Sequence, residues 1–223
     1  MSDRRAGTVF VLLLASGLCL AGLWLRMRHT GLAGYHFLGW NLFLAWIPFI
    51  AALMLVDGHR RGAARVVLLP VGLAWLLFLP NAPYLATDLV HVGRIPGAPI
   101  WSDAALVAGF AGTGLVLGLA SLLLVQGVVA DRLGKTVSWL LPLPVLVLSS
   151  VGVVLGRIDR LNSWDAVTDP SRVLDALAGY AADPGSRAVA LLLASTVALA
   201  VAYLVLVTVS GLVPARSRHR GDG

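Results

Sequence analysis

Residues 104–130 read AALVAGFAGTGLVLGLASLLLVQGVVA, a run of 27 residues without a charged side chain. About 20 consecutive apolar residues are needed to cross the hydrocarbon core of a bilayer as a helix. In lipid, such a run satisfies its backbone hydrogen bonds only when it is helical. This stretch therefore predicts a transmembrane helix.

The excess of apolar residues extends over the whole chain. Hydrophobic residues make up 58% and charged residues 13% of the 223 positions, and the mean hydropathy is +0.86. A soluble domain has about 45–50% apolar and about 25% charged residues. The sequence therefore predicts an all-α, polytopic integral membrane protein with one transmembrane domain over residues 1–223. Its six predicted spans are residues 8–25, 35–56, 65–80 (extending to 92), 104–130, 137–156 and 188–213.

The residue types indicate a bacterial source. All acidic residues are Asp, and all basic residues except one are Arg, a pattern typical of a GC-rich genome. We therefore expect a multi-pass protein of the bacterial cell (inner) membrane. The apolar run after Arg4 and Arg5 is interpreted as an uncleaved first helix rather than a cleaved signal peptide, because it is long enough to span. Cys19 is the sole cysteine, which excludes an intrachain disulfide.

Basic residues orient the spans, since cytoplasmic loops carry an excess of Lys and Arg. The side with both termini has ten basic residues and the other side has seven, most of which lie in the long loop 157–187. Both termini are therefore predicted to be cytoplasmic. The ten are Arg4, Arg5, Arg60, Arg61, Arg65, Arg132, Lys135, Arg216, Arg218 and Arg220, and the seven are Arg26, Arg28, Arg94, Arg157, Arg160, Arg172 and Arg187.

The net charge of +6 does not require a nucleic-acid partner. The basic tail ARSRHR at 215–220 is explained as a topology signal and an attraction to anionic lipid. We expect membrane lipid as a partner and no nucleic acid. An envelope protein or a second copy of the chain is a further candidate partner.

Polar side chains within the spans gather in the predicted outer leaflet. Such groups are costly in lipid and usually face the bundle interior or a water-filled cavity. The inner halves of the spans consist mostly of Val, Leu and Ala, with Gln126 as an exception. The sequence therefore predicts a polar cavity on the extracytoplasmic side.

The first polar motif is FLPNAPYLATDLVH at 78–91. Pro80 removes a backbone donor, so it predicts a kink or break near 80–83, with Asn81 as the N-cap of an outer half-helix at about 82–92. Tyr84, Thr87, Asp88 and His91 then share one helical face through spacings of three and four. Helix breaks at membrane depth are tolerated where they line a cavity or are buried against protein.

The second motif is GRIDRLNSWD at 156–165. Arg157 and Arg160, three residues apart, suit a bidentate clamp on a phosphate or carboxylate. Arginines at a helix C-terminus also complement the helix dipole or reach toward lipid headgroups, which leaves a structural explanation open. Residues 170–180 predict a short amphipathic helix on the outer surface, with Ser171 as its cap.

Small residues at Gly114 and Gly118 allow close helix packing, and we expect them to serve packing within the chain rather than a dimer. The candidate site follows from the two motifs. Asp88 and His91 are a candidate acid/base pair, or metal ligands together with Asp103 or Asp165, or a structural pair. The candidate substrate-binding residues are Asn41, Asn81, Tyr84, Thr87, Asp103, Arg157, Arg160, Asn162, Ser163, Trp164 and Asp165.

These two motifs, together with NLFLAWIP at 41–48, resemble the domain-of-unknown-function family 1361, small polytopic membrane proteins of bacteria and archaea. The resemblance covers roughly residues 35–170. It implies a membrane fold and supports the motif residues as a set, and it implies no activity, metal or cofactor.

Three function classes stay open at this point. The first is an enzyme or binding protein that uses the outer polar site on a lipid-linked or envelope substrate. The second is a non-catalytic scaffold or accessory subunit of an envelope complex. The third is a small transporter or channel, which the scarcity of polar groups in the inner halves and the lack of an internal repeat disfavour.

Overall fold

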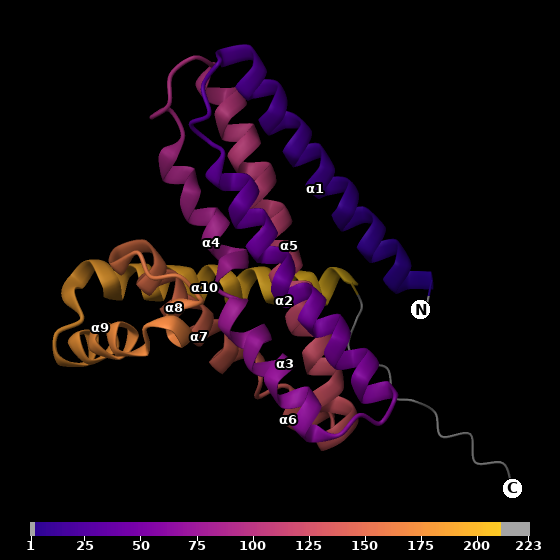
Figure 1. Cartoon of the computed structure of the whole chain (residues 1–223). Helices are drawn as coiled ribbons and strands as arrows, with labels where there is room; N and C mark the ends of the chain where they lie inside the picture. The colour runs from indigo at the N-terminus through magenta and orange to yellow at the C-terminus, as the bar shows by residue number, and fades with distance from the viewer. Residues whose placement is uncertain (1–2, 211–223) are drawn as a thin grey trace, which may run out of the picture.

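The computed structural model describes residues 3–210, and every regular element in this range is a helix. Figure 1 shows the helices in chain order. They are α1 (Asp3–Thr30), α2 (Phe37–Arg60), α3 (Arg65–Phe78), α4 (Asn81–Thr87), the 3-10 helix η1 (Asp88–His91), α5 (Ile100–Leu133), α6 (Lys135–Ser138), α7 (Pro142–Val154), the π-helix η2 (Leu155–Asp159), α8 (Asp165–Thr168), α9 (Pro170–Ala182) and α10 (Gly185–Ser210).

The predicted number of spans is confirmed. Six helical stretches are long and apolar enough to cross a membrane, and at the ends that the structure describes their limits lie within about five residues of the predicted ones. Residues 211–213 of the last predicted span lie outside the described residues. The six stretches are Arg5–Thr30, Phe37–Arg60, Arg65–His91, Ile100–Leu133, Lys135–Asp159 and Gly185–Val209.

Helices α2 and α5 form the centre of the molecule. α1, α3 and α4 pack around them, and α7 pairs with α10. In Figure 1, α10 crosses the direction of α2 and α5 rather than running alongside them. The buried apolar residues form two clusters, one around Tyr35, Phe49 and Phe110 and the other around Trp75, Leu122 and Tyr203.

The break predicted at the third span is confirmed. α3 ends at Phe78 and α4 begins at Asn81, so the two prolines of the motif flank the start of a separate short helix. The predicted capping role of Asn81 is wrong, because Pro80 is the N-cap residue and makes no side-chain cap. Asn81 Nδ2 instead donates to the Phe78 carbonyl oxygen at 2.9 Å.

Glycines let α4 approach its neighbours closely. A Cβ added at Gly114 would lie 2.7 Å from the Ala82 carbonyl oxygen, and one at Gly118 would lie 2.7 Å from the Ala82 Cβ. A Cβ at Gly152 of α7 would lie 2.4 Å from Pro80 Cγ. The small residues of α5 therefore serve packing within the chain, as expected.

Polar contacts occur at both ends of the bundle. Following the predicted topology, we call the side with the loops 31–36, 92–99 and 160–184 the outer end, and the side with the loop 61–64 and Gly134 the inner end. At the inner end, Arg5 Nη1 lies 3.5 Å from Asp57 Oδ1 and His59 Nε2 lies 3.7 Å from Asp131 Oδ2. The two polar motifs lie at the outer end, together on one side of the bundle.

Candidate functional site

Asp88 is the centre of a polar cluster at the outer end. Its side chain is 2% exposed, although it is ionisable and lies at the start of η1. Asn41 Nδ2 of α2 donates to Asp88 Oδ2 at 3.0 Å. The other carboxylate oxygen, Oδ1, lies 3.4 Å from Arg157 Nη1 and 3.7 Å from His91 Nδ1. Three side chains from three separate segments thus converge on one buried carboxylate, and we call these four residues the Asp88 cluster.

Arg157 reaches the Asp88 cluster from an unusual backbone segment. It lies on the single π-helical turn η2, and π-helical turns occur frequently at functional sites. Its guanidinium carbon lies 5.9 Å from the centre of the Tyr84 ring, which gives a cation–π contact. Gly156 makes room for this ring, because a Cβ there would lie 3.1 Å from Tyr84 Cε2. The two motifs therefore meet through Tyr84, Asp88 and Arg157.

Arg160 follows η2 in a left-handed conformation, with φ 58° and ψ 35°. It is the only non-glycine residue within 3–210 that has a positive φ. Such a conformation is unfavourable for a residue with a Cβ and is found most often at functional or tightly constrained sites. Its side chain is exposed and has no hydrogen-bond or ion-pair partner in the described part of the chain.

Two further contacts fix the second motif against the bundle. Asn81 Nδ2 donates to Ser163 Oγ at 2.8 Å, although the two residues are 82 positions apart. The Trp164 ring meets the Trp40 ring of α2 edge-on, with centroids 6.4 Å apart. These contacts keep the segment after η2 close to α2 and α4.

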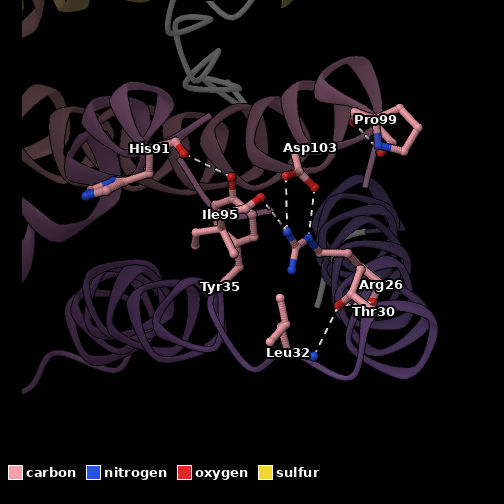
Figure 2. A network of polar contacts seen from close by, with 9 residues as sticks. Arg26, Thr30, Leu32, Tyr35, His91, Ile95, Pro99 and Asp103 are labelled. Atoms are coloured by element: carbon pink, nitrogen blue, oxygen red, sulfur yellow. Dashed lines mark hydrogen bonds and ion pairs between the residues drawn. The ribbon is translucent and has the colours of Figure 1, made fainter. Parts of the chain in front are cut away.

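Asp103 belongs to a second polar centre rather than to the Asp88 cluster (Figure 2). Arg26 of α1 holds its carboxylate with two bonds, from Nε at 2.8 Å and from Nη2 at 3.1 Å. Arg26 is 8% exposed, and its Nη2 also donates to the Ile95 carbonyl oxygen at 3.3 Å. This bidentate geometry is the strong form of an arginine–carboxylate pair. We call it the Arg26–Asp103 clamp.

Tyr35 connects the clamp to the Asp88 cluster. The guanidinium carbon of Arg26 lies 4.5 Å from the centre of the Tyr35 ring. The Tyr35 hydroxyl donates to the His91 carbonyl oxygen at 3.0 Å. Figure 2 shows the His91 imidazole pointing away from Arg26 and Asp103. The clamp therefore holds the backbone of η1 and leaves the His91 ring on the Asp88 side.

The remaining candidates serve local structure. Thr87 Oγ1 donates to the Tyr84 carbonyl oxygen at 2.6 Å, one turn earlier in its own helix. Asp165 Oδ2 accepts the backbone N–H of Asn162 at 2.6 Å and closes the turn that begins α8. No group of three or more His, Cys, Asp or Glu side chains suited to a metal is found among residues 3–210. Asp103 and Asp165, the proposed additional ligands, are each bonded elsewhere.

Arg26 and Tyr35 were missed as site residues by sequence reasoning. In the sequence, Arg26 is one of the basic residues that orient the spans, and Tyr35 is only the first residue of a predicted span. The available signal was a charged residue at the end of an apolar span, since such residues usually pair with a partner inside the bundle. Only the fold shows that this partner is Asp103.

The amphipathic helix α9 is attached to the end of η2. The Tyr180 hydroxyl donates to Asp159 Oδ2 at 2.8 Å. Burial of the hydroxyl, together with the hydrogen bond to Asp159 and its negative charge, raises the pKa of Tyr180 to about 12. The predicted cap of this helix is wrong, because Asp169 is the N-cap, accepting from the Arg172 N–H, while Ser171 Oγ donates to Asp169. Both bonds lower the pKa of Asp169, that from Ser171 more than that from Arg172.

The geometry can be compared with known proteins. No curated protein and no solved structure matches the chain. The family described as "Protein of unknown function (DUF1361)" matches residues 40–208, which run from the first turn of α2 to the last turn of α10 and include both polar motifs. The resemblance seen in the sequence is thereby confirmed and extends beyond residue 170. The chain belongs to the DUF1361 family.

Proposed function

We propose that this integral membrane protein binds the anionic headgroup of a lipid or lipid-linked envelope molecule at its outer end, through Arg157 with Arg160 nearby in the chain. The observation that carries the proposal is a difference between the two buried arginine–aspartate pairs. In the Arg26–Asp103 pair the arginine is fully engaged by the carboxylate, whereas in the Arg157–Asp88 pair the arginine can still bind another acceptor.

The Arg26–Asp103 clamp is closed because both carboxylate oxygens are bonded at 2.8 and 3.1 Å. Its side chains are only 6% and 1% exposed. Arg157 makes a single contact with Asp88, at 3.4 Å, and its side chain is 18% exposed. Charge-assisted N–H···O bonds are usually about 2.7–2.9 Å long. Arg157 therefore keeps most of its five donors for another acceptor.

The surroundings of Arg157 favour an anion that belongs to a lipid. Arg157 lies at the end of a stretch apolar enough to span a membrane, where headgroups are found. A guanidinium presents a planar fork that matches the oxygens of a phosphate. The strained, unpaired Arg160 supplies a second cation three residues away.

Binding accounts for the Asp88 cluster better than acid–base chemistry does. The Asp88 carboxylate is 2% exposed and already accepts from Asn41, so it has little access to a substrate proton. A general base must reach the proton that it removes within about 3 Å. His91 is the more accessible member, with a side chain 32% exposed. Acid–base catalysis by Asp88 and His91 is therefore the second candidate function, and the exposure of the His91 side chain is the observation that favours it.

The test is binding of a labelled phosphatidylglycerol to the purified protein in nanodiscs of neutral lipid. Arg157→Gln is expected to weaken binding by about 10-fold to 100-fold, the loss typical of a hydrogen-bonded charge. Arg157→Lys, which keeps the charge and loses the fork, should lie in between.

Arg187→Gln is the matched control, since it removes another outer-end arginine that is not part of the Asp88 cluster. If Arg157→Gln and Arg187→Gln bind the lipid as the unmodified protein does, the proposal is wrong. A non-catalytic scaffold role would then become the better account.

A further inference from the structure

We propose that Asp88 and the bound anion compete for Arg157, so that anion binding at the Asp88 cluster is coupled to uptake of one proton by Asp88. This inference rests on the proposed function and says how binding is regulated. The Asp88 cluster is a phosphate-binding site whose affinity depends on pH.

The first step is that, among residues 3–210, Arg157 is the only permanent cation in contact with Asp88. From α2 the carboxylate meets the neutral amide of Asn41, at 3.0 Å. From its own segment it meets His91 Nδ1, at 3.7 Å, and from η2 it meets Arg157, at 3.4 Å. The neighbouring helix α5 contributes Asp103, whose charge is already bound by Arg26, and α4 contributes the Tyr84 ring beside Arg157.

The second step is the consequence of removing that cation. A phosphate that draws the guanidinium toward the surface leaves a carboxylate 2% exposed with no fixed positive charge. Such a buried unpaired charge is strongly unfavourable, and the group becomes neutral instead. An O–H bond forms at one carboxylate oxygen, and the proton comes from solvent. The arginine then pairs with the phosphate and Asp88 is neutral.

The third step is a route for the proton. The His91 side chain is one-third exposed, and its Nδ1 lies 3.7 Å from Asp88 Oδ1. This nitrogen is buried and has no hydrogen-bond partner among the described residues. An imidazole can accept a proton at one ring nitrogen and release one from the other, so it connects the surface with the buried carboxylate. The ring remains unchanged overall after the transfer.

The Arg26–Asp103 clamp is an internal contrast within the same molecule. Both oxygens of Asp103 are bonded, and Arg26 is further held by the Ile95 carbonyl oxygen and the Tyr35 ring. An anion has no access to this arginine, so it does not compete with Asp103 for the guanidinium. The coupling belongs to Asp88 alone.

The test measures phosphatidylglycerol binding in neutral nanodiscs against pH, together with proton uptake followed by a pH indicator in weakly buffered solution. For one coupled proton, the affinity falls by about tenfold per pH unit above the pH at which Asp88 ionises in the free protein. Proton uptake approaches one per bound lipid in that range. Asp88→Asn keeps a side-chain oxygen for Asn41, binds more tightly, and shows neither the slope nor the uptake.

Two variants separate Asp88 from other charges. His91→Gln removes the route for the proton, so uptake becomes slower, while the slope, which is an equilibrium property, is kept. Asp159→Asn removes a nearby acid that bonds Tyr180 instead of Arg157, and it also keeps the slope. Equal slopes in the unmodified protein and in Asp88→Asn would overturn the proposal. If Asp88→Asn does not fold, proton uptake by the unmodified protein decides alone, and its absence overturns the proposal.

The source of the anion is settled by a second arm, in which inorganic phosphate is titrated into protein in neutral nanodiscs. Proton uptake with the lipid alone supports a headgroup site, whereas uptake with inorganic phosphate supports the coupling but assigns the site to a free anion. If Arg157→Gln loses binding but the affinity of the unmodified protein does not change with pH, the coupling is wrong and the proposed function stands. If Arg157→Gln binds as the unmodified protein does, both the coupling and the proposed function are wrong.

Discussion

Two aspartates at the outer end have similar burial and opposite roles. Asp103 is held by two bonds from Arg26, whereas Asp88 shares one long contact with Arg157 and one bond with Asn41. A buried ion pair contributes little net stability over an apolar pair, but removing one partner is strongly unfavourable. Removing one partner should therefore lower the stability of the protein most at the Arg26–Asp103 clamp.

Asp103→Asn is expected to destabilise the protein by about 3–5 kcal/mol, because the Arg26 charge is left buried without its partner. The measurement is reversible unfolding in mixed micelles of increasing SDS content. The matched control is Asp57→Asn, which removes an exposed pair with Arg5 and should cost no more than about 1 kcal/mol. The double substitution Arg26→Met with Asp103→Leu should recover most of the loss. A single variant as stable as the Asp57 control would contradict the clamp.

Tyr180 gives a prediction on pH. Its pKa of about 12 lies above the ordinary value of 10, because of burial and the bond to Asp159. The native protein thus holds this proton more tightly than the unfolded chain does. The contribution to stability is fully present below pH 10 and is lost as the pH rises through about 12.

The ionisation of Tyr180 is observed as the difference in absorbance near 295 nm between the unmodified protein and Tyr180→Phe. Asp159→Asn should lower this pKa toward 10, since it removes the negative charge beside the hydroxyl. A difference titration centred at 10 in the unmodified protein would show that the Tyr180–Asp159 contact is absent.

Sequence reasoning named all four members of the Asp88 cluster as candidates and paired Asp88 with His91, but it did not pair Asp88 with Asn41 or Arg157. Asp88, His91 and Arg157 stand out because polar groups are rare in spans. The spacing within each motif gives the local face, yet only the fold brings residues 41, 88 and 157 together. Asp103 was grouped with the cluster because it lies at the same depth, and its partner Arg26 is distant in sequence.

At the scale of elements, the break at Pro80 and the turn η2 position the two motifs. Proline chemistry predicts the break, since the lost donor and the ring clash are local effects. The π-helical turn and the left-handed Arg160 were not predictable, because Gly156 alone does not indicate a π-helix, Arg160 is not a glycine, and the conformation depends on contacts with other helices. α7 approaches the break closely at Gly152.

Gly152→Ala tests this approach. The new Cβ would lie 2.4 Å from Pro80 Cγ, and a proline ring has little freedom to move away. We expect a loss of about 1–3 kcal/mol, the usual cost of overpacking, measured by the same SDS unfolding. Gly112→Ala is the control, because nothing lies within 4 Å of its added Cβ and alanine favours the helix. Equal stabilities of the two variants would show that α7 and α4 are not in contact there.

At the scale of the whole molecule, the composition was enough to predict an all-helical protein with six candidate spans. Long uncharged runs leave a helix as the only structure that satisfies the backbone in lipid, so the number and approximate limits of the spans were predictable. The crossing of α10 relative to α2 and α5 was not, because tilt is set by packing against neighbours.

The central claim is that the Asp88 cluster opens on the extracytoplasmic side. It is tested by single cysteines in a Cys19→Ser background, labelled in intact cells with a membrane-impermeant maleimide. His91→Cys reports the outer end, where the native side chain is 32% exposed, and His59→Cys reports the inner end, where it is 21% exposed. We predict labelling of residue 91 in intact cells and of residue 59 only after permeabilisation, and the reverse pattern would contradict the account.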